Sequence, residues 1–420
     1  MSKLKFIFLG LILFFYGCKS AHVAKKIIKH FDTDFYDNQF TGLLIYDPKT
    51  KDTILNYNGD KYFTPASNTK IFTLYTALQV LTDKIPAFKY HIDRDTITIQ
   101  GTGDPTFLHP FFQDSTALKM VQNFKKVNLI LNNLADDKYG PGWAWEDYDT
   151  YFSPERSSFP MYGNVVTVNN PHSLQSIPKV VENHVQYSST KNARDFNANN
   201  FYYNPKSNKT VEIPMVIDSL LIAELWNSIL PGKVFITNYS PKKRNLIAYS
   251  VHSDSLYKRM MHESDNFLAE QILILSSSTL SDTLSSNKIR NFILENQLKD
   301  LKQKPRWVDG SGLSRYNLFT PTSFVQVLTK LYTNVPRTRL FNLFPAGGEF
   351  GTLKKWYAGN PKPYVYAKSG TLGNNYSLSG YLITNSGKTL IFSFMNNHFT
   401  KPTVEVKSNM QSILELLRDN

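Results

Sequence analysis

The most informative stretch of the sequence is Pro65-Ala66-Ser67-Asn68-Thr69-Lys70-Ile71-Phe72, where a polar turn leads into an apolar segment. From Ser67 to Leu81 the apolar residues recur at helical spacing, which predicts a buried helix with Ser67 at its start. Ser67 and Lys70 are three positions apart and therefore share one face of that helix. A serine hydroxyl is a weak nucleophile, and a lysine whose pKa is lowered by burial and nearby positive charge can activate it. Backbone N–H groups at the helix N-terminus would stabilise an oxyanion.

The Ser-x-x-Lys pattern is weak evidence by itself, because a capping serine followed by a solvated lysine has the same spacing. It occurs seven times, starting at Ser2, Ser67, Ser176, Ser188, Ser240, Ser255 and Ser285. The copy at Ser67 differs from the others because it opens a long apolar helix after a predicted hairpin. Two predicted strands, residues 42–46 and 53–57, form that hairpin.

Two further polar motifs follow along the chain. Ser264-Asp265-Asn266 interrupts an apolar helical stretch over residues 255–276, and three polar side chains there need hydrogen bonds if they are buried. Lys368-Ser369-Gly370-Thr371 directly follows a predicted strand over residues 364–367. Its glycine permits close approach of another backbone, and its lysine and hydroxyls suit a carboxylate ligand. Taken singly, each motif could instead be a polar surface turn or a solvated strand end.

In this order, the three motifs resemble the Ser-x-x-Lys, Ser-Asp-Asn and Lys-Thr-Gly set of penicillin-binding proteins and serine β-lactamases, with Ser369 replacing the threonine. The wide gap between residues 67 and 264 implies an inserted domain. It makes the chain similar to the class C low-molecular-mass penicillin-binding proteins, the D-alanyl-D-alanine carboxypeptidase/endopeptidase family. Residues 103–106, 141–147 and 309–315 extend this resemblance.

The resemblance implies an α+β fold of the serine β-lactamase/penicillin-binding-protein type, an antiparallel sheet with flanking helices. We expect a discontinuous catalytic domain and a strand-rich inserted domain. The insertion is shorter than is usual for the family, so the resemblance does not extend to the family's smallest subdomain. The predicted domains are residues 18–83 with 244–420, and residues 84–243. Further predicted strands and helices cover residues 96–99, 127–131, 165–168, 322–332, 378–384, 390–395 and 404–417.

The resemblance also implies catalytic roles. Ser67 would attack the penultimate D-alanine carbonyl while Lys70 takes its proton, and water would later hydrolyse the acyl-enzyme. Ser264 would relay a proton to the leaving amine, and Asn266 would hold the substrate amide. Lys368 would bind the terminal carboxylate or tune Lys70.

The implied substrate-binding residues are Ser369, Gly370, Thr371 and Asp147. Asp147 would bind the free amine of a peptide side chain, although it could instead be part of a surface turn. The expected partners are peptidoglycan stem peptides, with β-lactams as covalent inhibitors, and no cofactor or metal is expected. Two alternatives stay open, namely an inactive peptidoglycan-binding scaffold and an esterase or β-lactamase of the same superfamily.

The N-terminus predicts export. Met1-Ser2-Lys3-Leu4-Lys5 precedes an apolar run over residues 6–16, so residues 1–17 form a predicted signal peptide. The single cysteine, Cys18, follows directly and resembles a lipoprotein lipobox, although Tyr16 stands where a small residue is usual. A chance cysteine after an ordinary signal peptide is the alternative. We expect a protein on the periplasmic side that is lipid-anchored to a membrane.

Composition and charge limit the function classes. The 420 residues are 41% hydrophobic and 19% charged, which is a globular composition with room for two or three domains. The formal net charge of +13 suits an anionic surface, but the basic residues are spread along the chain. No nucleic-acid partner is therefore predicted.

Overall fold

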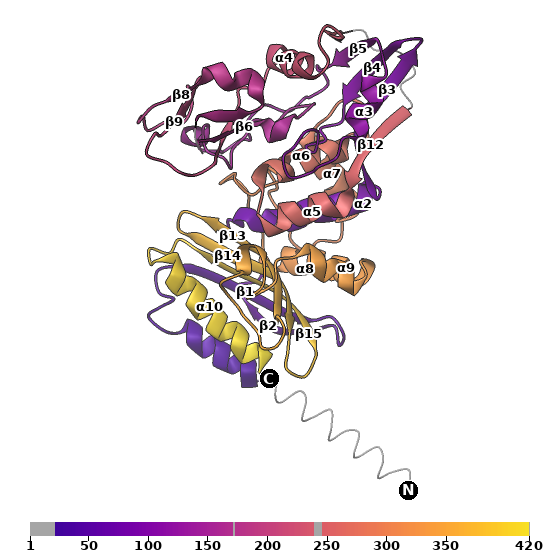
Figure 1. The fold of residues 1–420 in the computed structure, drawn as a ribbon. Coiled ribbons are helices and arrows are strands. Elements are labelled where there is room, and N and C mark those ends of the chain that lie inside the picture. Colours follow the sequence, from indigo (N-terminus) through magenta and orange to yellow (C-terminus); the bar gives the residue numbers. More distant parts are fainter. Residues whose placement is uncertain (1–21, 171–172, 239–245, 420) are drawn as a thin grey trace.

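The computed structural model describes residues 22–170, 173–238 and 246–419, so the predicted signal peptide and Cys18 lie outside the described residues. The elements form two groups (Figure 1). One contains a sheet between helices, and we call it the catalytic unit. The other spans residues 84–252, and we call it the inserted unit. Within the described residues, no helix has the length and apolar character needed to cross a bilayer.

The catalytic unit is built on a five-stranded sheet with the order β13-β14-β15-β1-β2, in which all neighbours are antiparallel. Its strands confirm the predicted hairpin and the three predicted C-terminal strands. One correction concerns Lys368 to Thr371, which lie inside β13 and not after it. The strands are β1 (Phe40–Asp47), β2 (Asp52–Tyr57), β13 (Val365–Leu372), β14 (Asn375–Ile383) and β15 (Thr389–Asn397).

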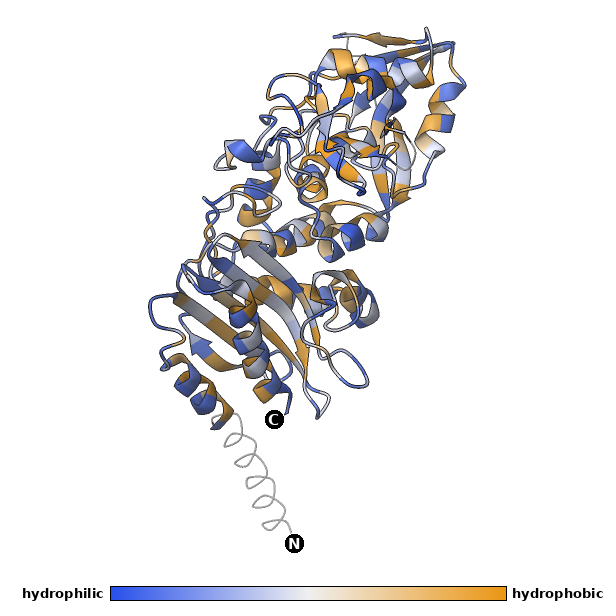
Figure 2. Ribbon diagram, turned by 60° about the vertical axis from the view of Figure 1, so that its left-hand side comes forward, coloured by the Kyte–Doolittle hydropathy of each residue, from blue (hydrophilic) through white to orange (hydrophobic). Residues whose placement is uncertain are grey.

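Helices cover both faces of this sheet because side chains alternate along each strand. In β15, Phe392 and Phe394 belong to the core beneath α10 (Thr403–Arg418) and the helix over residues 22–31. Ile391 and Met395 point into the larger helical core on the opposite face. The helices at the surface accordingly combine hydrophobic and hydrophilic residues (Figure 2).

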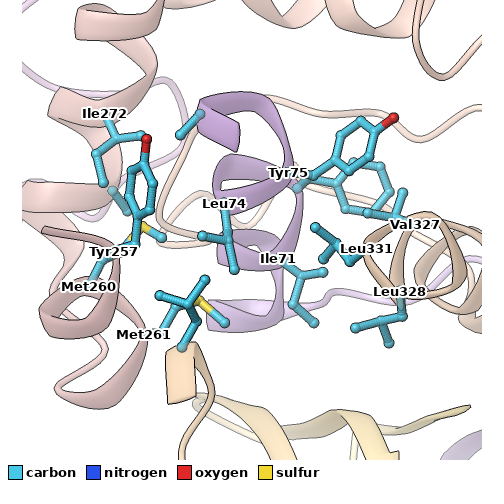
Figure 3. Packing of buried hydrophobic residues seen from close by; sticks show 14 of the residues in the cluster. Ile71, Leu74, Tyr75, Tyr257, Met260, Met261, Ile272, Val327, Leu328 and Leu331 are labelled. Carbon is cyan, nitrogen blue, oxygen red and sulfur yellow. The ribbon is translucent and has the colours of Figure 1, made fainter. Parts of the chain in front are cut away.

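The helical core surrounds α2 (Lys70–Val80). Figure 3 shows Ile71, Leu74 and Tyr75 of α2 between Met260 and Met261 on one side and the apolar residues of α8 on the other. A single 3-10 turn, Ala66–Thr69, precedes α2, so Ser67 lies in that turn and Lys70 begins the α-helix. The other helices are α5 (Ser253–His262), α6 (Asn266–Ser277), α7 (Ser286–Glu295), α8 (Pro321–Asn334) and α9 (Arg337–Leu343).

The predicted helical stretch over residues 255–276 is two helices, α5 and α6. Ser264 has a φ of 58°, in the left-handed region, which ends α5. Asp265 then caps α6, because its side chain accepts the Leu268 backbone N–H at 3.0 Å. This break turns the Ser264 hydroxyl toward Lys368 on β13 and the Asn266 amide toward Lys70 at the start of α2.

The inserted unit contains a five-stranded mixed sheet with the order β11-β5-β4-β3-β12. Because β12 pairs with β3, this sheet runs past residue 243 to His252. A three-stranded sheet (β10-β6-β7), a β8–β9 pair and two helices complete the unit. The elements are β3 (Lys84–Asp93), β4 (Thr96–Gly101), α3 (Thr116–Gln122), β5 (Lys126–Ile130), β6 (Val165–Asn169), β7 (Gln175–Ile177), β8 (Val185–Tyr187), β9 (Phe201–Tyr203), β10 (Val211–Pro214), α4 (Ser219–Ile229), β11 (Val234–Ile236) and β12 (Leu246–His252).

Candidate active site

The centre of the site is the buried amine of Lys70. Its Nζ lies 2.9 Å from Ser67 Oγ, 2.7 Å from Asn266 Oδ1 and 2.8 Å from the Ser311 carbonyl oxygen. Lys70 is fully buried, whereas Ser67 is partly exposed and open to an incoming substrate. The predicted serine–lysine pair is therefore within hydrogen-bond distance.

Burial lowers the pKa of Lys70 to about 8. The carboxylates of Asp309, Asp265 and Glu270 act in the opposite direction and stabilise the protonated amine. Nearby positive charge was predicted to contribute to this lowering, but burial is the cause. A pKa near 8 leaves a useful fraction of neutral amine at physiological pH.

Lys368 and Ser264 form a second lysine–serine pair beside the first. Lys368 Nζ donates to Ser264 Oγ at 2.8 Å and to the Ser369 carbonyl oxygen at 2.8 Å. Burial and the charge of Lys70 hold the pKa of Lys368 well below its usual range. Together with Asn266, which accepts from Lys70, the two pairs bring all five residues predicted to be catalytic to one place.

Gly370 lets β13 lie against the turn that carries Ser67. A Cβ at this position would be 2.6 Å from the Pro65 carbonyl oxygen and 2.8 Å from the Ser67 backbone nitrogen. Any side chain would therefore push the strand away from the nucleophile. The next residue, Thr371, is exposed at the end of this contact, and the Ser369 hydroxyl donates to Thr352 Oγ1 at 2.8 Å.

Asn266 joins the site to the inserted unit. Its Oδ1 accepts from Lys70, and its Nδ2 donates to the Phe152 carbonyl oxygen at 3.0 Å. These two contacts fix which end of the amide faces Lys70. Asn266 was predicted to hold the substrate amide, and one lone pair and one N–H remain for that purpose.

Sequence reasoning missed the turn over residues 310–312 as a part of the site. The Ser311 carbonyl is a direct partner of Lys70, and the Glu270 carboxylate holds the same turn through two backbone N–H groups. Asp309 caps the turn by accepting the Gly312 N–H at 2.9 Å. The signal was the Asp309-Gly310-Ser311-Gly312 sequence, whose two glycines point to close backbone contacts.

Asp147 lies on a neighbouring loop of the inserted unit and is half-buried. Burial and the adjacent Glu146 raise its pKa, while Arg315 lowers it. The loop is tied to the site because Trp143 Nε1 donates to Asp309 Oδ2 at 2.9 Å. Asp147 therefore lies on a loop that contacts Asp309, and within the described residues no hydrogen bond or ion pair joins it to Lys70 or Lys368.

A metal site is absent from the described part of the chain. There, no three His, Cys, Asp or Glu side chains gather closely enough to hold a metal ion.

Comparisons with known proteins identify the family. The model of the D-Ala-D-Ala carboxypeptidase 3 (S13) family matches residues 23–214 and 219–418. The D-alanyl-D-alanine carboxypeptidase DacB of Haemophilus influenzae is 23% identical over 423 residues, which cover 87% of each chain. The penicillin-sensitive carboxypeptidase A of Dictyostelium discoideum is 22% identical and covers 89% of this chain and 85% of its own.

Solved structures agree on the fold. Penicillin binding protein 4 of Haemophilus influenzae superimposes with a TM-score of 0.71 at 20% identity, covering 91% of this chain and 97% of its own. Its complex with a β-lactam gives a TM-score of 0.62 at 19% identity, covering 91% and 96%. These matches confirm the predicted α+β fold. With the family model spanning almost all of the described chain, the protein belongs to the D-Ala-D-Ala carboxypeptidase 3 (S13) family of class C low-molecular-mass penicillin-binding proteins.

Proposed function

We propose that this chain removes the terminal D-alanine from peptidoglycan stem peptides through an acyl-enzyme on Ser67, and that it also cleaves peptide cross-links. The family supports the carboxypeptidase reaction. The endopeptidase reaction follows from the same chemistry, because both remove an amine from a D-alanyl carbonyl. β-Lactams would acylate the same serine.

The observation that carries the proposal is the set of three partners around Lys70 Nζ. A neutral lysine amine has two N–H donors and one lone pair, whereas the ammonium has three donors. Asn266 Oδ1 and the Ser311 carbonyl can only accept, so they take both N–H groups. The lone pair then faces the Ser67 hydroxyl, which can donate to it at 2.9 Å. This is the arrangement that a general base requires.

The reaction proceeds in two steps. Lys70 takes the Ser67 proton as Oγ attacks the penultimate D-alanine carbonyl, and the backbone N–H groups of Ser67 and Thr371 stabilise the oxyanion. The C–N bond then breaks, and the proton that Lys70 took passes through Ser264 to the leaving amine, which leaves Lys70 neutral again. Water, deprotonated by the same base, hydrolyses the ester and restores Ser67.

The terminal carboxylate of the peptide would be bound by Lys368, Ser369 and Thr371. This role would explain why a buried lysine lies on β13, the edge strand of the sheet. Asn266 would bind the backbone amide of the substrate peptide. Asp147 would bind a free amine on a side chain of the same peptide. The reaction would take place on the periplasmic side, with Cys18 as a lipid anchor.

A fluorescent penicillin tests this proposal directly. We expect one covalent adduct, mapped by mass spectrometry of peptides to Ser67, and we expect Ser67→Ala to lose both the adduct and D-alanine release. An adduct on Ser311 or another serine would refute the assignment. A folded protein that binds cell-wall peptides without forming any adduct would support the scaffold alternative, whereas fast hydrolysis of penicillin without D-alanine release would support a β-lactamase.

A further inference from the structure

Glu270 is a buried carboxylate behind the site that the mechanism above does not use. It is 1% exposed and lies one helical turn after Asn266 on α6, so both side chains project from the same face. Its Oε1 accepts the backbone N–H groups of Gly310 at 2.9 Å and Ser311 at 2.7 Å. A buried carboxylate that accepts two backbone N–H groups holds those groups in a fixed orientation.

The turn held by Glu270 is packed on all sides. Thr73 Oγ1, on α2, donates to the Gly310 carbonyl at 2.7 Å. A Cβ at Gly310 would lie 2.5 Å from the Ala269 carbonyl oxygen, and a Cβ at Gly312 would lie 1.9 Å from that of Ala66. The turn therefore fills the space between α6, α2 and the turn carrying Ser67, and its Ser311 carbonyl points at Lys70 Nζ.

We infer that Glu270 is a positioning residue, which fixes the Gly310–Ser311 turn so that the Ser311 carbonyl occupies one N–H of Lys70 and leaves the lone pair facing Ser67. Asn266 occupies the other N–H directly. Helix α6 thus sets both acceptors around the amine, one through a side chain and one through the turn. The inference rests on the proposed role of Lys70 as the base.

The other oxygen of Glu270 faces the inserted unit. Oε2 lies 3.5 Å from Arg156 Nη1 and has no hydrogen-bond partner among the described residues. Arg156 is itself buried and lies 3.7 Å from Asp136. A competing explanation is therefore that Glu270 only supplies charge to Arg156, with no effect on Lys70.

Two variants of Glu270 separate geometry from charge. Glu270→Gln keeps an acceptor oxygen at the same reach but removes the charge. Glu270→Asp keeps the charge but is one methylene too short to accept both N–H groups. We expect Glu270→Asp to slow penicillin acylation by about 10- to 100-fold, on the scale seen when a reacting group is misplaced by an ångström. Glu270→Gln should recover most of that rate.

The pH profile provides a second readout. Lys70 faces the carboxylates of Asp309, Asp265 and Glu270, and Lys368 lies beside it. Glu270→Gln leaves the other three groups in place but removes one negative charge that raises the pKa of Lys70. The pH at which the acylation rate begins to rise should therefore shift to a lower value. Glu155→Gln is the matched control, because Glu155 is also a buried glutamate that accepts a backbone N–H, from Ile217 at 2.7 Å. It should leave both rate and profile unchanged.

Fast acylation by a folded Glu270→Asp variant, or equal slowing in the Asp and Gln variants, would overturn the inference. Loss of activity in the unmodified protein would instead overturn the proposed function, so the two failures are distinguishable. If Glu270→Asp fails to fold, the Glu270→Gln variant alone tests the inference. Slowing of its acylation by tenfold or more, which corresponds to about 1.4 kcal/mol in activation free energy, would contradict positioning by the acceptor oxygen.

A cavity in the inserted unit carries a second, independent inference. It has a volume of about 630 Å³ and lies between the β8–β9 pair and β10. Tyr151 at its rim precedes Phe152, whose carbonyl accepts from Asn266. Glu212, also in the lining, has a pKa raised by burial and by the charge of Asp265, which caps the same catalytic helix. The cavity therefore adjoins the loop segment, Tyr151 and Phe152, that contacts Asn266.

The lining suits a neutral ligand with hydroxyl and amide groups. Three tyrosines supply aromatic faces, hydroxyl and amide side chains supply hydrogen bonds, and Lys191 and Glu212 cancel in charge. Tyr151 is 68% exposed, and exposed Trp145 and Phe196 lie on the same unit with ring centroids 6.5 Å apart. Unburied aromatic rings near a cleft are typical of a binding surface. We infer that this cavity binds the N-acetylated sugar to which the stem peptide is attached.

This inference deepens the proposed function and is tested with two substrates, a disaccharide–pentapeptide and the same pentapeptide without sugar. Tyr151→Ala should raise KM about five- to tenfold for the disaccharide–pentapeptide, the effect of losing one aromatic contact. Its kcat, and both constants for the free peptide, should not change. Tyr249→Ala on β12 is the control, because Tyr249 is also exposed, at 40%, but lies on an edge strand outside the cavity lining. An equal KM change for both substrates, or none, would overturn the inference, whereas no D-alanine release by the unmodified protein would overturn the proposed function.

Discussion

The behaviour of single residues in this site follows from burial. Lys70 and Lys368 are two lysines held within one small, fully buried volume, and each loses most of its hydration there. Lowering the pKa of both amines relieves the cost of burying two like charges. The site therefore favours a state in which at least one amine is neutral, which is the state that can accept a proton.

The first prediction concerns the pH dependence of acylation. Protonated Lys70 has no lone pair, so the penicillin acylation rate should fall about tenfold per pH unit below a pKa of about 8. Above that pKa the rate should level off. Stopped-flow acylation measured across this range tests the sign, and a rate that is flat or that rises toward acid pH would contradict a neutral lysine base.

A second prediction at this scale concerns Asp147. Its half-buried carboxylate lies on the loop that Trp143 ties to Asp309, and it could pair with a free amine on the substrate. Asp147→Ala should lower kcat/KM for a peptide with a free side-chain amine by about tenfold, the effect of losing one ion pair that is partly shielded from water. The N-acetylated peptide serves as the reference. Unchanged relative efficiency for the two peptides would exclude this role.

At the scale of elements, the break between α5 and α6 positions the second motif. Ser264 adopts a left-handed conformation that costs about 1 kcal/mol for a residue with a Cβ. The gain is that its hydroxyl points at Lys368 Nζ, 2.8 Å away, while Asn266 begins the next helix. Such strain at the candidate site supports the proposed role of the Ser264 hydroxyl in the chemistry.

The third prediction separates these two effects. Ser264→Gly relieves the strain and removes the hydroxyl, so we expect unchanged or slightly higher stability together with a loss of about 100-fold or more in D-alanine release, the scale of a lost proton-transfer group. Ser264→Ala should lose activity similarly without the gain in stability. Thermal unfolding and turnover measured on the same samples check both parts. Retained turnover in Ser264→Gly would exclude the proton relay.

The elements also show what the sequence could predict and what it could not. Strand patterns located β1, β2 and the three C-terminal strands, and helical periodicity located α2, α8 and α10, because these helices have long apolar patterns. It missed the break at Ser264, since a left-handed residue leaves no mark on apolar spacing. The sequence also provided no prediction for Glu270. The role of a carboxylate inside an apolar helix can be recognised only when its partners are known, and these are the backbone N–H groups of residues 310 and 311.

At the scale of the whole molecule, N-terminal anchoring would place the enzyme beside its substrate. Cys18 lies outside the described residues, and the first described helix begins at residue 22, close after it. A lipid on Cys18 would hold the catalytic unit at a membrane surface. Cys18→Ser should therefore move the protein from the membrane to the soluble fraction after cell breakage. Detergent-free recovery of the unmodified protein as a soluble species would contradict anchoring.

The last prediction concerns how the inserted unit is joined to the catalytic unit. Gln271, on α6 directly after Glu270, is fully buried, and its Nε2 donates to the carbonyl oxygens of Gly103 and Ser157, each at 2.9 Å. Its Oε1 accepts the Ser157 N–H at 3.1 Å. One side chain therefore satisfies three backbone groups of the inserted unit from a helix that also carries Asn266 and Glu270.

Gln271→Ala would leave these three backbone groups without partners, and each buried, unpaired group costs about 1–3 kcal/mol. After partial relaxation we expect a loss of about 2–4 kcal/mol in the free energy of unfolding, measured with urea. Gln326→Ala is the control, because Gln326 is a half-buried helical glutamine that bonds near the surface, and it should cost about 0.5 kcal/mol or less. Since α6 also carries the groups around Lys70, acylation should slow in Gln271→Ala but not in the control. Equal stability of the two variants would mean that Gln271 contributes little to holding the two units together.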